Sequence, residues 1–198
     1  MKRSISLPNQ IGYTMIELLI TLSIVALVAS AAGPNLRNAI NKSERSACLG
    51  EAVAMLNLAR SEAVGRQRPV ALCSSSDQTS CNSNNWEDGW LMFVDDGSGS
   101  AGVAIDRDIN GDEQKLHVSE SSCNSAALRS ANLTDAGGIT FLPDGMTTDR
   151  GTLVVCDDSG TNNATAVVLN ISGQPRLATD MTGDGIVEDD TGVAVSCS

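Results

Sequence analysis

The sequence contains a glutamate, Glu17, within a long apolar run, where an ionised side chain is energetically unfavourable. Glu17 lies near the start of the apolar run 13–32, which contains no basic residue. As a helix with a rise of about 1.5 Å per residue, this run would be about 30 Å long, the thickness of a bilayer's hydrocarbon core. An ionised carboxylate inside that core costs about 2.5–3.5 kcal/mol or more. We therefore expect Glu17 to pair with an amine from outside the run, and the best candidate is the α-amine freed by cutting the chain before Tyr13, carried by a neighbouring copy or a partner subunit.

No other residues show a pattern typical of catalysis. His117 is the single histidine, and the sequence has no Gly-x-Ser-x-Gly, His-Glu-x-x-His or Gly-Lys-[Ser/Thr] pattern. The glycine run 97–102 fits Gly-x-Gly-x-x-Gly, but a dinucleotide site needs a helix after the glycines. The segment 103–106 does not predict one, and Asp95 and Asp96 would repel a pyrophosphate. We interpret the run as a hairpin loop and do not expect an enzyme.

Two acidic loops resemble the first half of a calcium-binding loop, with oxygen ligands at alternate positions and a glycine at the sixth. The candidate calcium ligands are Asp106, Asp108 and Asn110 in the first loop and Asp180, Asp184 and Glu188 in the second. Position twelve, which should be a glutamate, is His117 in the first loop and Thr191 in the second. Tight turns also need Asp, Asn and Gly, so a purely structural role is the alternative. Beyond calcium, no cofactor is expected.

Six cysteines give an even count that is typical of a disulfide framework. Their spacing does not fix the pairing, although we favour Cys73 with Cys81, which closes a short polar loop. A bridge from Cys156 to Cys197 would hold the C-terminal tail against a strand. The remaining two, Cys48 and Cys123, either pair or stay free. A zinc site is disfavoured because there is no Cys-x-x-Cys pair.

Composition limits the classes of function. The chain has 198 residues, a length sufficient for one domain and an anchor. Its formal net charge is −11. This acidity argues against broad phosphate binding, and aromatic residues make up only 3% of the chain, which leaves few platforms for stacking on single-stranded nucleic acid. Lys2 and Arg3 should stay on the cytoplasmic side of the anchor, which places the body on the opposite side, where disulfides persist if that compartment is a bacterial periplasm.

The pattern along the chain predicts an α+β fold. Helical sequence continues beyond the apolar run to a terminator at Gly65, with a kink rather than a stop at Pro34. Residues 125–132 could add two helical turns. Short strands separated by turn residues are expected at 70–73, 90–94, 115–118, 138–142, 152–156 and 164–171, with two weaker candidates at 176–178 and 193–195. The second half of the helix has an apolar stripe suited to packing on this antiparallel sheet.

The N-terminus resembles the type III signal of type IV pilins and type II secretion pseudopilins. The resemblance lies in Lys2 and Arg3 in a polar leader, then Gly12 before Tyr13, with Glu17 at the fifth position after the glycine. It implies that a prepilin peptidase cuts after Gly12 and methylates Tyr13, and that Glu17 guides assembly. The family usually has Phe where this chain has Tyr13. An ordinary signal anchor with a stray glutamate is the alternative.

Four further segments are similar to the GspH/FimT group of minor pilins and pseudopilins. They are 58–64, 86–96, 139–145 and 172–176. The resemblance implies a type IV pilin-like fold with a leader at 1–12, a helix at 13–66 that is transmembrane over 13–32, and a β-rich periplasmic domain at 67–198. It also implies a filament subunit of a type IV pilus or type II secretion system, anchored in the bacterial inner membrane with its N-terminus in the cytoplasm. The expected partners are other pilins, the prepilin peptidase and the inner-membrane assembly platform.

Two other functions stay open. Some FimT-like proteins are thought to bind DNA through a C-terminal Gly-Arg-x-Arg pattern. The matching place here reads Gly173-Gln174-Pro175-Arg176 and keeps only Arg176 of the two arginines, so the resemblance supports DNA as a partner only weakly. The second alternative is a simple membrane-anchored periplasmic binding domain outside any filament.

Overall fold

The structure is a computed structural model that describes residues 12–95, 97, 105, 107, 109, 113–121, 123, 125–133 and 137–197, and leaves out the side chains of 31–35. The chain divides into two compact units, Met1–Ile40 and Asn41–Ser198. The glycine run and the first acidic loop, with Asp106, Asp108 and Asn110, lie outside the described residues.

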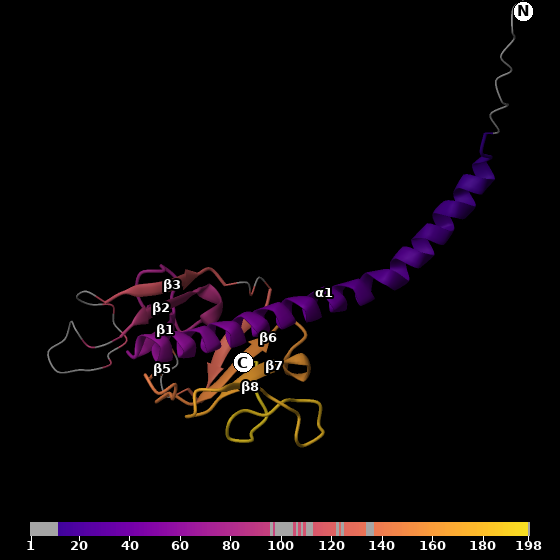
Figure 1. The fold of residues 1–198 in the computed structure, drawn as a ribbon. Helices are drawn as coiled ribbons and strands as arrows, with labels where there is room; N and C mark the ends of the chain where they lie inside the picture. The colour runs from indigo at the N-terminus through magenta and orange to yellow at the C-terminus, as the bar shows by residue number, and fades with distance from the viewer. Residues whose placement is uncertain are drawn as a thin grey trace, which may run out of the picture. The chain divides into compact units, whose positions relative to one another are not determined.

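A single helix, α1 (Met15–Arg66), runs from the first unit into the second (Figure 1). Its end is made by Gln67, which adopts a left-handed conformation with φ 55°, and by the N–H of Arg68, which donates to the carbonyl oxygen of Ala63 at 3.3 Å. This is the Schellman arrangement of a helix C-terminus, followed here by Pro69. The terminator expected at Gly65 is wrong, because Gly65 lies inside the helix and Gln67 takes the left-handed position instead.

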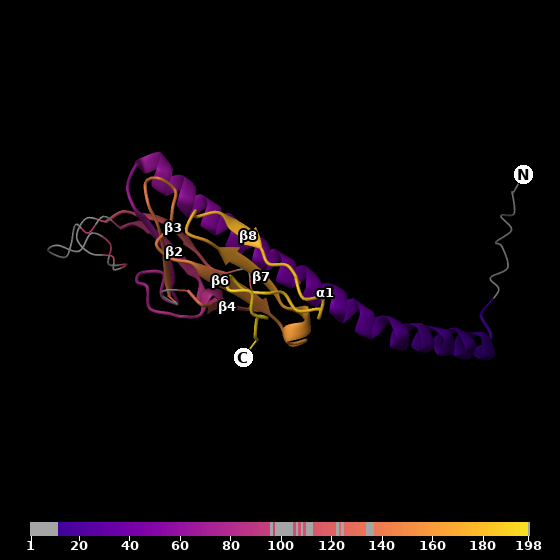
Figure 2. The ribbon, with the colours of Figure 1, turned by 90° about the horizontal axis from the view of Figure 1, so that it is seen from below.

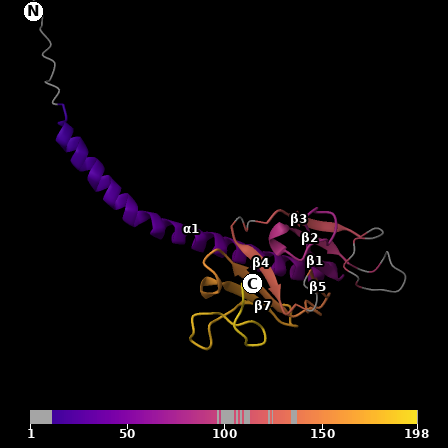
Figure 3. The same cartoon turned by 180° about the vertical axis from the view of Figure 1, so that it is seen from behind.

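Among the described residues of the second unit, eight strands form two antiparallel sheets. Sheet A has the order β3-β2-β1-β5 and sheet B the order β4-β6-β7-β8 (Figures 1 and 3). The strands are β1 (Val70–Ser74), β2 (Trp90–Val94), β3 (Lys115–Ser119), β4 (Ala127–Ala131), β5 (Gly138–Phe141), β6 (Gly151–Cys156), β7 (Thr165–Leu169) and β8 (Pro175–Leu177). Two short 3-10 turns, η1 (Trp86–Asp88) and η2 (Thr161–Asn163), precede β2 and β7. A helix followed by antiparallel sheets confirms the predicted α+β class.

The second half of α1 forms one hydrophobic core with both sheets. Ala52, Leu56, Ala59 and Ala63, which recur at spacings of three and four, are fully buried in it. The inward side chains of the sheets complete this core, among them Val70, Leu72, Trp90, Met92, Ile139, Phe141, Leu128, Leu153, Val155, Val167 and Leu169. Figure 2 shows the helix passing alongside the strands of both sheets.

The opposite faces of the sheets are covered as well. On sheet A, the outward side chains of β1 and β2 pack with Cys81 and Ile109. On sheet B, the outward side chains Val154 and Ala166 pack beneath the C-terminal segment, which contributes Val195 and Cys197. Burial on both faces explains why the central strands are continuously apolar instead of alternating with polar residues.

Three disulfides join all six cysteines. Cys73–Cys81 and Cys156–Cys197 are the two pairs favoured from the sequence, and Cys48–Cys123, which the spacing left open, ties α1 to the segment before β4. The Cys156–Cys197 bridge fastens the C-terminal segment over sheet B, where it packs.

Two expected elements are wrong. The helical turns predicted for 125–132 are strand β4, which pairs with β6 from Ala127↔Cys156 to Ala131↔Thr152. Its Ala, Leu and Arg favour a helix locally, but the partner strand and the burial of Leu128 outweigh that propensity. The strand expected at 193–195 is reduced to one isolated bridge between Glu188 and Ala194.

Three of the segments that carry the pilin resemblance meet at one junction. From α1, Arg60 donates through Nε to the carbonyl oxygen of Gly145 at 2.9 Å. Gly173, with φ 70°, lies against the same carbonyl, and a Cβ added to Gly173 would stand 2.2 Å from that oxygen. Glycine is thus required at 173 for both its backbone conformation and its close approach.

We predict that Gly173→Ala destabilises the globular unit far more than Gly160→Ala does. Gly160 has a similar φ of 79° but nothing within 4 Å of an added Cβ, so its substitution carries only the left-handed cost of about 1–2 kcal/mol. The clash at Gly173 should raise that to about 3–5 kcal/mol. Urea unfolding of the full chain in detergent measures both values, and equal losses would contradict the role of this contact.

Candidate functional site

The first turn of α1 positions Glu17. Thr14 precedes the helix, and its Oγ1 accepts a hydrogen bond from the backbone N–H of Glu17 at 3.3 Å. A threonine three residues before a glutamate is the pattern of a capping box at a helix N-terminus. A carboxylate in the first turn is also favoured by the helix dipole. The sequence reasoning missed the cap at Thr14, although the Thr-x-x-Glu spacing would have revealed it.

Glu17 has no cationic partner in the described residues. It forms no ion pair there, and a hollow of about 320 Å³ lies beside it, lined by Tyr13, Glu17, Leu18 and Thr21. The hydroxyl of Thr21 donates to the carbonyl oxygen of Leu18 at 2.9 Å, so the helix itself satisfies it. Glu17 is the one charged residue in the lining of this hollow.

The apolar side chains around Glu17 are exposed to solvent. In the described part of the first unit, their exposed fractions range from 47% at Ile40 to 86% at Tyr13. The exposed residues are Tyr13, Met15, Ile16, Leu18, Leu19, Ile20, Leu22, Ile24, Val25, Leu27, Val28, Leu36 and Ile40. A contiguous apolar surface of this size marks a place where the chain meets another protein or a membrane.

The predicted processing point lies just before the helix. Gly12 and Tyr13 are exposed and not helical. The leader that precedes Gly12 lies outside the described residues.

Beyond Glu17 the helix continues without a break through Pro34. The kink predicted there stays a prediction, because the side chains of 31–35 are not described. Among the described residues, no helix combines the length and the apolar character that crossing a membrane requires. The transmembrane segment at 13–32 likewise stays a prediction.

The second acidic loop brings its three predicted ligands together. One carboxylate oxygen from each of Asp180, Asp184 and Glu188 lies within 4.8 Å of the others. Within the described ranges this is the one group of acidic, cysteine or histidine side chains close enough to hold a metal ion, and His117 belongs to no such group.

The same carboxylates also hold the loop's own backbone. The N–H groups of Gly183 and Gly185 donate to Asp180 at 2.6 and 2.8 Å. These bonds, that of Gly185 first, hold the pKa of Asp180 below its ordinary value. Glu188, only 2% exposed, accepts from the backbone N–H and the hydroxyl of Thr182 at 3.2 and 3.0 Å. The tight-turn interpretation therefore has direct support in the geometry.

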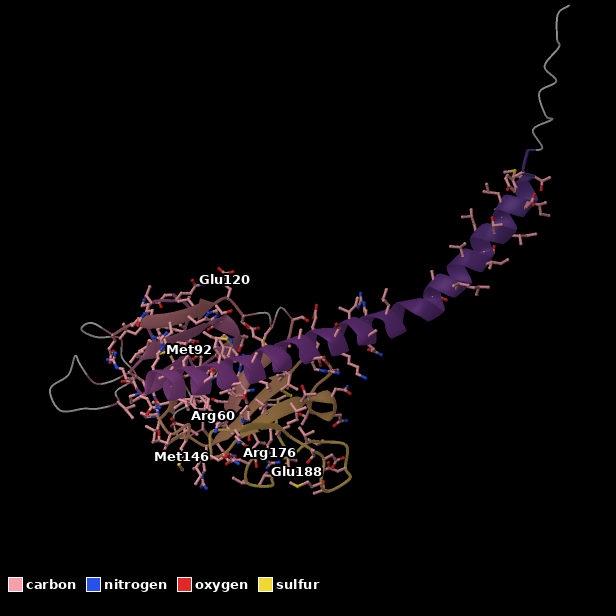
Figure 4. The ribbon with its side chains drawn as sticks, viewed as in Figure 1. Arg60, Met92, Glu120, Met146, Arg176 and Glu188 are labelled. Carbon is pink, nitrogen blue, oxygen red and sulfur yellow. A yellow bond between two sulfur atoms is a disulfide. The ribbon has the colours of Figure 1, made fainter. Side chains whose placement is uncertain are left out.

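Arg176, the candidate for DNA, lies exposed on strand β8 (Figure 4). It lines a cavity of about 200 Å³ together with Arg150, from the loop before β6, and Asp190. Sequence reasoning missed Arg150, because only the pairing of the strands brings it near Arg176.

Comparisons with known proteins agree with this geometry. The family model described as Type II transport protein GspH matches residues 50–173, and the model described as a prokaryotic N-terminal methylation motif matches residues 7–33. None of the curated protein sequences compared with this chain matches it.

Three solved structures are similar to this chain. One crystal form of the type IV minor pilin FimU of Pseudomonas aeruginosa aligns with a TM-score of 0.52 at 20% identity, over 69% of this chain and 90% of that chain. A second crystal form gives 0.49 at 20% identity, over 68% and 92%. The minor pseudopilin EpsH of the Vibrio cholerae type 2 secretion system gives 0.40 at 14% identity, over 68% and 95%. The first of these alignments shows that the fold is that of a type IV minor pilin.

The GspH match covers more than half of the 198 residues, and it includes α1 from Gly50 onward and the strands from β1 to β7. The methylation motif covers Gly12, Tyr13 and Glu17. This chain belongs to the GspH family of type II transport proteins.

Proposed function

We propose that this chain is built into a pilus or pseudopilus as a minor subunit that acts in the assembly or initiation of the filament. The observation that carries the proposal is the capped carboxylate of Glu17, which forms no ion pair within the described residues and lies at the start of a helix half whose described apolar side chains are all exposed. In a filament, neighbouring helices would cover this apolar surface, and the N-terminal amine of the next subunit would neutralise Glu17.

The proposal includes a path to the filament. The chain would enter the bacterial inner membrane with residues 13–32 as its anchor, its N-terminus in the cytoplasm and its globular unit in the periplasm. The prepilin peptidase would cut after Gly12 and methylate Tyr13, and the inner-membrane assembly platform would extract the subunit. Three disulfides in the globular unit suit an oxidising compartment.

The two alternative functions have less support. DNA capture through Arg176 would need a row of cations along a phosphate backbone, whereas the cavity at Arg176 includes Asp190 and the whole chain carries −11. A simple anchored binding domain outside a filament would leave the carboxylate of Glu17 without a role. We therefore favour the structural subunit over both, and over a catalytic role.

The mature N-terminus tests the processing step. We expect mass spectrometry of the protein purified from cells with an active prepilin peptidase to find a chain that begins at Tyr13 and carries one methyl group on its amine. A Gly12→Leu variant should keep its leader, because the peptidase would no longer find glycine before the cut. A wild-type chain that retains Met1 would rule out the assembly mechanism.

Substitution of Glu17 tests the ion pair. Glu17→Val and the nearly isosteric Glu17→Gln should both reach the membrane in normal amounts and fall at least about tenfold in filament incorporation, because the amine of the next subunit would lack its counter-charge. Thr21→Val, which lines the same hollow, is the matched control and should be incorporated normally. Incorporation is measured by immunoblotting of sheared filaments, and wild-type levels for Glu17→Gln would refute the role of the charge.

The acidic loop is our proposed site for a cation. We propose that Asp180, Asp184 and Glu188 hold one Ca²⁺ weakly, because three protein oxygens are about half of the six to eight that this ion takes. Water would complete the shell. The hydrogen bonds that close the loop without an ion suggest that Ca²⁺ would add stability and not create the fold.

Calcium addition tests this site. With a dissociation constant of about 0.1–1 mM, 10 mM CaCl₂ should stabilise the globular unit by about 1–3 kcal/mol relative to EGTA. Asp184→Asn should abolish the gain, whereas Asp144→Asn, on another loop, should retain it. An unchanged midpoint of thermal unfolding for the wild type would leave the loop as a self-closed turn.

A further inference from the structure

Two arginines of the globular unit have no partner among the described residues. Arg150 and Arg176 are exposed and make no hydrogen bond or ion pair in the described part of the chain. The other arginines between Asn41 and Ser198 each contact a protein group: Arg45 with Asp157, Arg60 with Gly145, Arg66 with Glu62, Arg107 with Asp149, Arg129 with Glu87, and Arg68 as well. In a chain with 24 acidic and 13 basic residues, two unpaired guanidinium groups in one place need an explanation.

The strand register explains why these two arginines meet. Thr152 of β6 pairs with Val168 of β7, which pairs with Arg176 of β8. Side chains of paired residues share a face of the sheet, and so does Arg150, two residues before Thr152. This is the outer face of sheet B, the face of Val154 and Ala166 that the C-terminal segment covers further along. Arg150 and Arg176 line a cavity on the part of this face that the C-terminal segment does not fill.

The rest of the cavity is mostly apolar. Its volume is about 200 Å³, and Val168, Leu169 and Ile171 contribute to its lining. Ile171 is 57% exposed. The side-chain oxygen of Asn170 already accepts hydrogen bonds from Ser172, and the two arginines are the cationic donors in the lining.

We infer that this cavity binds a carboxylate side chain and its aliphatic neighbour from an acidic segment of an adjoining filament subunit. Two guanidinium groups can hold one carboxylate through charge-assisted hydrogen bonds, and Ile171 would receive the apolar part of the same segment. The inference rests on the proposed function, because it places the partner in the filament, and it assigns to the globular unit a contact separate from that of the N-terminal helix.

The composition of the cavity favours an acidic peptide over a nucleic acid. Arg150, Arg176 and Asp190 together give the lining a formal charge of +1, which one carboxylate neutralises and the several phosphates of a polyanion exceed. The lining has no aromatic residue on which a base could stack.

A photo-crosslinking experiment in cells tests the inference. Ile171 is replaced by p-benzoylphenylalanine in the full chain, alone and combined with Arg150→Glu, Arg176→Glu or Lys115→Glu. Lys115 is an exposed cation on β3 of the other sheet, so Lys115→Glu changes the net charge equally and serves as the control. Crosslinked peptides are identified by mass spectrometry, and sheared filaments report incorporation.

We expect a crosslink to a peptide of an adjoining subunit that contains Asp or Glu. Arg150→Glu and Arg176→Glu should each lower its yield at least about tenfold, since each removes charge-assisted hydrogen bonds, while Lys115→Glu should leave it unchanged. Replacing the identified acid of the partner by Lys should restore the yield with Arg150→Glu. Thermal unfolding midpoints equal to that of the wild type would confirm that the variants are folded.

Other outcomes overturn the inference. If the wild-type chain enters filaments but Arg150→Glu does not lower the crosslink yield, the inferred contact is refuted and the proposed function is not. A wild-type chain that is absent from filaments removes both. Nuclease-sensitive crosslinks, or retention of a DNA duplex that falls tenfold with Arg150→Glu but not with Lys115→Glu, would assign the cavity to nucleic acid instead.

Discussion

The two halves of α1 have different environments, because the second half is buried against the sheets and the first half is exposed. The rest of the structure depends on this difference. In the second half of α1, small and branched side chains such as Ala52 and Leu56 are fully buried against the two sheets. In its first half, the described apolar side chains are exposed, and no other described residue covers them. Burial of apolar surface is the dominant favourable term in folding and in most protein association. The second half therefore serves folding, and the first half is available for association with other molecules.

Much of the fold could be predicted because local patterns and tertiary contacts agree. The central strands β1, β2 and β6 are apolar runs between turn residues, and they appear where they were expected. The prediction failed where a long-range contact decides the conformation. Strand β4 has the composition of a helix, and only its pairing with β6 makes it extended. Gln67 ends α1 in a left-handed conformation, which is uncommon for glutamine and therefore is not predicted from the sequence.

The same distinction applies to the sites. Glu17 could be singled out from the sequence because an isolated charge in an apolar run is anomalous wherever the chain folds. The acidic loop 180–188 is contiguous, so its spacing alone brought the carboxylates together. Arg150 could not be found in this way, because its relation to Arg176 depends on the register of β6, β7 and β8. Sites built from one segment are visible in a sequence, whereas sites built across strands require the sheet.

The edge of sheet B formed by β8 is protected against aggregation at high local protein concentration. This strand is only three residues long, begins with Pro175 and is followed by a segment held by the Cys156–Cys197 bridge. Long, flat and unprotected strand edges recruit strands from other molecules and start aggregation, and proline and short length block this. Many copies can therefore lie side by side without adding strands to one another's sheets at this edge.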